Sequence, residues 1–352
     1  MMPSVRVVFA AASLVAVTSV WYACGSDDGS TFGPGGTVFE EDSGIEGGEA
    51  PDTGPAFEVD AGEGGLLVDG GPDTGCLAPV DMFIMFDRST SMNAPLPGTD
   101  RTANCDGGKT TAPDGSAMVT RWCSSIGALS GYFRSGPAGV EEEKKPGAAI
   151  QFFPQEDASA AASSAGEGYH VAASPPTTYT RLPSTSFDAL LNSTMRVNST
   201  PTEGALRGIM RFTDNPANRI GGHVTIGILI TDGNPSACAI TDPVQLAGLL
   251  AGDAGDSGSA RRVYVIGMTG ATFSSLETIA AGGGAPLHPS NYPLPDGGVL
   301  LNTCGAGAMD DAGMCRHWNV ADGDPAVFIA ALAAIQEQSD GCKPGGGTVN
   351  PK

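Results

Sequence analysis

Two short apolar segments that each end in an aspartate most constrain the fold of this chain. Residues 223–233 (HVTIGILITDG) form a nearly unbroken apolar run closed by Asp232, and residues 79–87 (PVDMFIMFD) repeat the pattern and close on Asp87. Strands that are apolar on both faces are typical of a parallel sheet covered by helices on both sides. The chain is therefore predicted to contain a buried parallel sheet in which two strands end in a carboxylate.

Amphipathic segments alternate with further strand-like runs. Strands are predicted at 148–154, 261–270 and 317–322, and helices at 118–133, 186–195, 202–215, 243–252, 272–284 and 324–338. This alternation predicts a single α/β domain with a doubly wound, mostly parallel central sheet flanked by helices. In such a sheet, ligands bind at the carboxyl ends of the strands, where the strand order switches.

The N-terminus has the pattern of an export signal. One arginine precedes an apolar stretch that ends at Ala23, directly before Cys24. Residues 1–23 are therefore predicted to be a signal. The segment resembles a bacterial lipoprotein signal, although Trp21 stands where an aliphatic residue is usual. The resemblance implies a lipid on Cys24 that anchors the protein in a membrane, as in an outer-membrane or cell-surface lipoprotein of a Gram-negative bacterium.

An acidic, Gly/Asp-rich segment follows the signal. It contains thirteen acidic side chains and no Lys or Arg between Cys24 and Cys76, so residues 24–75 are predicted to be a disordered tether. Calcium-binding repeats are the alternative, but no regular period and no complete Asp-rich loop motif supports them. The folded domain is placed at 76–342, followed by a flexible tail at 343–352. A net charge of -21 over the whole chain argues against a nucleic-acid partner.

Eight cysteines in an exported chain predict disulfides, because the compartment outside the cytoplasm is oxidising. The candidate pairs are Cys76 with Cys342, Cys105 with Cys123, and Cys304 with Cys315, which leaves Cys238 without a predicted partner. A zinc site built from Cys304, Cys315 and His317 is an alternative. It is disfavoured because the spacing lacks the close cysteine pairs of structural zinc sites.

Oxygen-bearing side chains gather at the ends of the two defining strands. Asp87, Ser89 and Ser91 alternate in FDRSTS, Thr200 lies in NSTPTEGAL before a predicted helix, and Asp232 closes the second strand. Such hard oxygen ligands suit Mg²⁺, Mn²⁺ or Ca²⁺. Capping of the loop by its own serines is the alternative explanation of the DRSTS segment.

A DxSxS sequence, a loop threonine and a strand-end aspartate, in this order, resemble the von Willebrand factor A (VWA) family and its metal-ion-dependent adhesion site. The resemblance covers 76–342 and departs from the family in an insertion at 158–183 and in residues 286–316. It implies that Ser89, Ser91 and Thr200 ligate a divalent cation, with Mg²⁺ expected before Mn²⁺ or Ca²⁺. Asp87 and Asp232 would hold the cation directly or through water. Thr200 is preferred to Thr202 because its spacing to the following helix fits the family better.

The resemblance implies a binding protein and not an enzyme. Two carboxylates would balance a divalent cation while neutral hydroxyls complete its shell, so that an acidic side chain of a protein partner can bind the cation. No small-molecule cofactor is expected. A phosphoryl-transfer enzyme of the DxDxT type would need an acid where Ser89 stands, and no GxSxG nucleophile motif occurs. A metal-binding accessory subunit of a secreted enzyme or transport complex is the alternative function.

Overall fold

A computed structural model describes residues 78–94, 96, 109–111, 117–136, 141–155, 166–173, 179–194, 199–252, 262–294, 297–320 and 323–340. The signal, Cys24, the tether, the tail, and Cys76, Cys105 and Cys342 lie outside these ranges, so the predictions made for them stay predictions. Within the ranges, none of the helices is long and apolar enough to cross a membrane.

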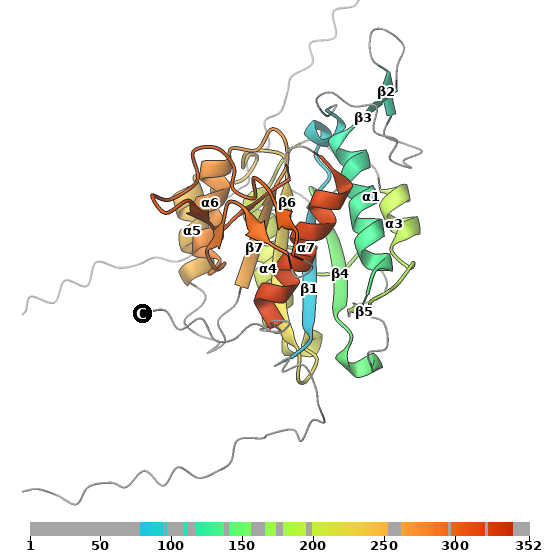
Figure 1. The fold of residues 1–352 in the computed structure, drawn as a ribbon. Helices are drawn as coiled ribbons and strands as arrows, with labels where there is room; N and C mark the ends of the chain where they lie inside the picture. Colours follow the sequence, from blue (N-terminus) through green and yellow to red (C-terminus); the bar gives the residue numbers. More distant parts are fainter. Residues whose placement is uncertain are drawn as a thin grey trace, which may run out of the picture.

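A six-stranded sheet forms the centre of the domain, with the order β12-β7-β6-β1-β4-β5 (Figure 1). Its strands are β1 (Val80–Asp87), β4 (Gly147–Phe153), β5 (Thr180–Arg181), β6 (Val224–Thr231), β7 (Arg262–Gly267) and β12 (Trp318–Asn319). All neighbours pair in parallel except β5, which pairs antiparallel with β4. Counted along the chain, the order is that of a doubly wound sheet, and it switches direction between β1 and β6. The predicted fold class is confirmed.

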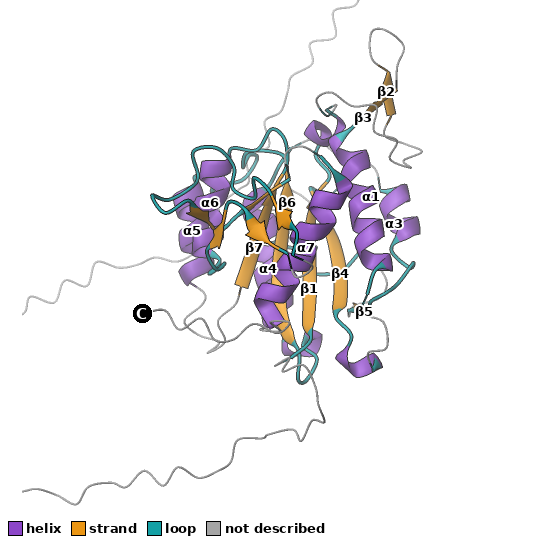
Figure 2. Cartoon of the chain, in the orientation of Figure 1, coloured by secondary structure: helices purple, strands orange, loops and turns teal. Residues whose placement is uncertain are grey.

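Helices cover both faces of this sheet (Figure 2). They are α1 (Arg121–Arg134), α3 (Asp188–Ser193), α4 (Thr202–Asp214), α5 (Pro243–Gly252), α6 (Phe273–Gly282) and α7 (Pro325–Asp340), with short 3-10 turns η1 (Thr90–Asn93), η2 (Glu142–Lys144) and η3 (Pro216–Asn218). Successive side chains of β1 point to opposite faces. Phe83 stacks on Phe212 of α4 with ring centroids 3.8 Å apart, whereas Phe86 stacks on Trp122 of α1 at 4.9 Å. The apolar run of β1 is therefore buried on both sides, as its sequence predicts.

Two parts of the fold differ from the sequence prediction. Strand β5 lies inside the segment 158–183, which was predicted as an insertion without a strand. It is only two residues long, and its Thr-Arg sequence carries no apolar periodicity that could reveal it. The segment before α1 contains a short antiparallel pair, β2 (Lys109–Thr111) and β3 (Ala117–Val119), which was also not predicted. Met118 and Val119 lie in β3 and not at the start of the predicted helix, which begins at Arg121.

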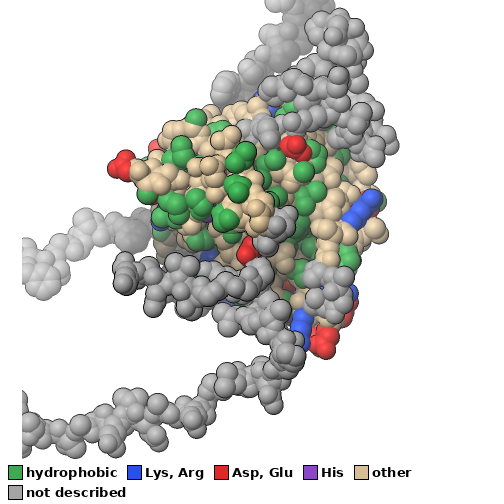
Figure 3. Space-filling model, in the orientation of Figure 1, with side chains coloured by type: hydrophobic (Ala, Val, Ile, Leu, Met, Phe, Trp, Pro, Cys, Tyr) green, Lys and Arg blue, Asp and Glu red, His purple; other side chains and the backbone are tan. Residues whose placement is uncertain are grey.

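The segment between α6 and β12 is mostly irregular and carries exposed apolar side chains. Its strands β8 (His288–Pro289), β9 (Tyr292–Pro293), β10 (Val299–Leu300) and β11 (Met314–Cys315) form two short antiparallel pairs, β8 with β11 and β9 with β10. Among the described residues, the segment contributes four of the six exposed large apolar side chains: Leu287, Val299, Leu301 and Met309. Figure 3 shows hydrophobic side chains spread over this side of the surface. The segment therefore combines exposed apolar side chains with buried residues such as Leu300 and Cys315.

Candidate metal centre

Asp87 joins the two strands at the switch point and holds the loop that follows β1. Its Oδ1 accepts a hydrogen bond from the Ser89 amide at 2.7 Å, and its Oδ2 accepts one from the Thr231 hydroxyl at 2.6 Å. Thr231 is the last residue of β6, the neighbour of β1. The carboxylate is fully buried. Asp87 therefore fixes the position of the DRSTS loop against β6.

This loop reaches Asp232 across the switch point through Ser91. The Ser89 and Ser91 hydroxyl oxygens lie 2.7 Å apart, and the Ser91 hydroxyl donates to Asp232 Oδ1 at 2.7 Å. The turn η1 orders the loop between them, because the Met92 amide donates to the Ser89 carbonyl at 3.1 Å. Four of the five predicted residues thus belong to one hydrogen-bonded cluster.

Thr200, the fifth predicted residue, lies against the same strand end. A β-carbon placed on Gly233, the residue after Asp232, would lie 3.0 Å from the Thr200 hydroxyl oxygen. The loop of Thr200 is clamped by Ser236, whose hydroxyl accepts from the Thr200 amide at 3.0 Å and whose amide donates to the Thr200 carbonyl at 2.9 Å. Thr202 instead turns its hydroxyl toward the Thr200 carbonyl within the first turn of α4, at 3.4 Å. The structure therefore places Thr200 beside the residue that follows Asp232, and its role as a ligand in preference to Thr202 stays a prediction.

The two carboxylates of the cluster favour a cation. Burial, followed by the nearby charge of Asp232, raises the pKa of Asp87 to about 7, although hydrogen bonds from Thr231 and Ser89 oppose the shift. A cation beside the two carboxylates would stabilise their ionised forms. The side chains that meet here offer carboxylate and hydroxyl oxygens, which is the donor set that Mg²⁺, Mn²⁺ and Ca²⁺ prefer. The residues present therefore fit a hard divalent cation.

Three further residues of the centre were missed by sequence reasoning. Thr231 bonds Asp87, Ser236 clamps Thr200, and the Arg121 guanidinium donates from Nη1 to Asp232 Oδ2 at 2.6 Å. Thr231 is adjacent to Asp232 and could have been found as a hydroxyl at the same strand end. Arg121 and Ser236 have no comparable sequence signal, because only the tertiary fold brings them to the site.

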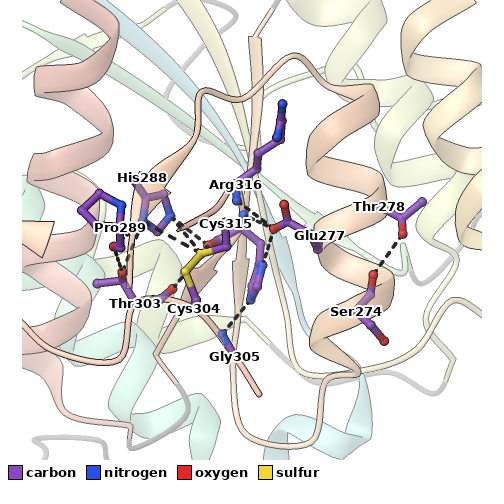
Figure 4. Close-up of polar contacts among 11 residues, drawn as sticks. Ser274, Glu277, Thr278, His288, Pro289, Thr303, Cys304, Gly305, Cys315 and Arg316 are labelled. Atoms are coloured by element: carbon purple, nitrogen blue, oxygen red, sulfur yellow. Dashed lines mark hydrogen bonds and ion pairs between the residues drawn. A yellow bond between two sulfur atoms is a disulfide. The ribbon is translucent and has the colours of Figure 1, made fainter. Parts of the chain in front are cut away.

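A second cluster of polar side chains surrounds the disulfide between Cys304 and Cys315 (Figure 4). His288 Nε2 lies 3.6 Å from the Cys315 sulfur. His317 donates from Nδ1 to Glu277 at 2.7 Å and accepts the Gly305 amide on Nε2 at 3.0 Å, so both of its ring nitrogens are engaged. The two sulfurs are bonded to each other, which confirms the predicted disulfide over the zinc alternative.

The buried His288 should make the protein less stable in acid. Burial lowers the pKa of His288, so the folded state holds the neutral ring and the unfolded state takes up a proton more readily. Stability from this residue is therefore present above pH 6.5 and is lost below it, by at most about 2 kcal/mol at pH 5. We expect His288→Gln to reduce the fall in unfolding free energy between pH 7.5 and pH 5.0, measured by urea denaturation.

The control for this measurement is His170→Gln, which replaces a half-buried histidine outside the cluster. An equal effect of the two substitutions on the pH dependence would contradict the assignment to His288.

Comparisons with known proteins give weak likenesses. No protein-family model and no curated protein matches the sequence. A solved structure of proximal thread matrix protein 1 from the mussel byssus is 13% identical over 75% of this chain and 47% of its own, with a TM-score of 0.37. The ArnB paralog VWA2 from Sulfolobus acidocaldarius is 12% identical over 75% and 46%, with a TM-score of 0.35. A mussel structure described as having a zinc-occupied MIDAS motif is 16% identical over 59% and 40%, with a TM-score of 0.31.

This chain spans less than half the length of each of these proteins.

Proposed function

We propose that the domain binds a divalent cation at the carboxyl ends of β1 and β6 and uses it to capture a protein partner through an Asp or Glu side chain. Ser89, Ser91 and Thr200 would ligate the cation, and Asp87 and Asp232 would balance its charge. The observation that carries this proposal is the hydrogen bond between the DRSTS loop and Asp232 across the two strand ends, with Thr200 packed beside the next residue, Gly233. Mg²⁺ is the proposed metal, because neutral hydroxyls and water suit its octahedral shell.

The arrangement of the two carboxylates supports the proposed roles. Both oxygens of Asp87 accept hydrogen bonds from the protein, so this residue would orient the serines and supply charge from behind them. Asp232 Oδ1 contacts the Ser91 hydroxyl and is positioned to share the same cation. Because the three proposed ligands are neutral hydroxyls, the bound cation would keep enough positive charge to attract a further carboxylate.

The same reasoning leads us to propose binding without catalysis. Nucleophilic use of Ser89 or Ser91 would require an adjacent base, such as a histidine. His288 and His317 are instead buried around the disulfide, and His223 bonds the Glu143 carbonyl at 2.7 Å. From the signal-like N-terminus we further propose that the protein is exported to the cell surface and membrane-anchored through Cys24, where it would serve adhesion or scaffolding.

Cation binding is the first test of this proposal. Titration calorimetry of the folded protein with MnCl₂, and then MgCl₂, should give one site per chain that disappears when a chelator is added first. Mn²⁺ serves as the probe because it accepts the same oxygen ligands. A flat titration with both metals at millimolar concentration would contradict the proposed function.

Partner capture is the second test. Pull-downs from surface extracts should recover the same partner with Mg²⁺ and lose it with chelator, and a short Glu-containing peptide should compete. Recovery of one multi-subunit enzyme or transport complex would favour the accessory-subunit alternative.

A further inference from the structure

Arg121 occupies a position that its own helix disfavours. It is the first residue of α1, where the helix dipole presents partial positive charge, and the first turn contains no acidic side chain. Arg134 stands at the other end of the same helix, where a basic side chain is favourable. A charge placed against the local preference indicates that a tertiary contact determines its position.

That tertiary contact is Asp232 of the metal centre. The Arg121 side chain is 14% exposed and the Asp232 side chain is 0% exposed, so the ion pair of 2.6 Å is largely shielded from solvent. Shielded pairs interact more strongly than surface pairs, because water screens them less. Asp232 therefore accepts a hydrogen bond from the Ser91 hydroxyl on Oδ1 and one from the Arg121 guanidinium on Oδ2.

The loop after β7 is also shaped around the guanidinium. Gly270 has a φ of +99°, and a β-carbon on it would lie 2.5 Å from Arg121 Nη1 and 3.0 Å from Cζ. A side chain at this position would strain the backbone and displace the guanidinium. Elements far apart in the sequence, α1 and the loops after β6 and β7, thus enclose the charged end of Arg121.

Arg121 changes the net charge of the centre. Asp87, Asp232 and Arg121 together carry one net negative charge when both carboxylates are ionised, whereas the two aspartates alone would carry two. A divalent cation would bring the centre to +1 with Arg121 and to zero without it. We propose that Arg121 is a specificity-determining residue of the metal centre, which weakens the binding of the cation and strengthens the binding of a carboxylate ligand to the loaded centre.

This inference rests on the proposed function, and Arg121→Gln tests it through two effects of opposite sign. Because a positive charge close to the site is removed, the variant should bind Mn²⁺ on the order of tenfold more tightly in calorimetry. The Mn²⁺-loaded variant should bind acetate on the order of tenfold more weakly. Acetate binding is read from the broadening of its methyl proton signal by the paramagnetic ion.

Two matched variants make the result specific. Arg134→Gln removes the same charge from the same helix at an exposed ion pair with Asp188, and it should leave both affinities unchanged. Arg121→Lys keeps the charge and should stay close to the wild-type protein in both measurements. A purely structural role for Arg121 would instead weaken Mn²⁺ and acetate binding together in Arg121→Gln, which would overturn the inference.

The same experiment separates this inference from the proposed function. If the wild-type protein binds no Mn²⁺, the proposed function fails. The inference then fails with it. If the wild-type protein binds Mn²⁺ and Arg121→Gln changes neither affinity, the proposed function stands and the inference alone fails.

Discussion

Replacing Asp87 with alanine is expected to weaken Mn²⁺ binding by about 100-fold or more, because the substitution removes both a charge and the anchor of the ligand loop. The carboxylate accepts the Ser89 amide and the Thr231 hydroxyl, so without it the two serines lose the contact that holds their loop against β6. Titration calorimetry with MnCl₂ measures the change. Partner capture in Mg²⁺ should be lost with it.

One control variant and one further variant of Asp87 make this prediction specific. Asp188→Ala removes one negative charge at an exposed ion pair on α3 and should leave Mn²⁺ affinity unchanged. Asp87→Asn keeps the shape of the side chain, and because burial and Asp232 raise the pKa of Asp87 to about 7, a neutral group should be tolerated in the folded protein. An Asp87→Asn variant that folds but gains no thermal stability from Mn²⁺ would support the role of Asp87. Undiminished Mn²⁺ affinity in the alanine variant would refute it.

The sequence predicts the inner strands of the sheet well because these buried strands consist mainly of apolar residues. β1 and β6 are apolar on both faces, and helices on both sides of the sheet require that pattern. The edge strands have no such apolar pattern. β5 and β12 are each two residues long. Their pairing therefore depends on the free backbone groups of the neighbouring strand and not on their own side chains. The candidate last strand at 317–322 was nevertheless placed correctly around β12.

The cluster at the ends of β1 and β6 was predictable where its residues follow strand ends. Asp87 and Asp232 close apolar runs, and parallel strands bring their carboxyl ends to the same edge of the sheet. Arg121 is different, because its place beside Asp232 depends on how α1 packs and on the room that Gly270 leaves. Among the predicted disulfides, Cys304 with Cys315 is confirmed. The pairs that include Cys76, Cys105 or Cys342 stay predictions.

Removing the Cys304–Cys315 disulfide should destabilise the domain substantially. The chain-entropy model assigns about 3 kcal/mol to a cross-link that closes a loop of this size, here with a sequence separation of 11. The surrounding segment has strands of only two residues, so the disulfide acts there together with side-chain contacts such as those of Glu277 with the Arg316 and His317 amides.

We expect the double variant Cys304→Ala, Cys315→Ala to lose about that free energy of unfolding in urea. The fluorescence of Trp318 should change as well, since its ring stacks on His288 with centroids 3.9 Å apart beside the disulfide. Met309→Ala, an exposed site in the same segment, is the control and should behave like the wild-type protein. If the double variant unfolds at the wild-type urea concentration, the contacts of Glu277 with the Arg316 and His317 amides hold this segment without help from the disulfide.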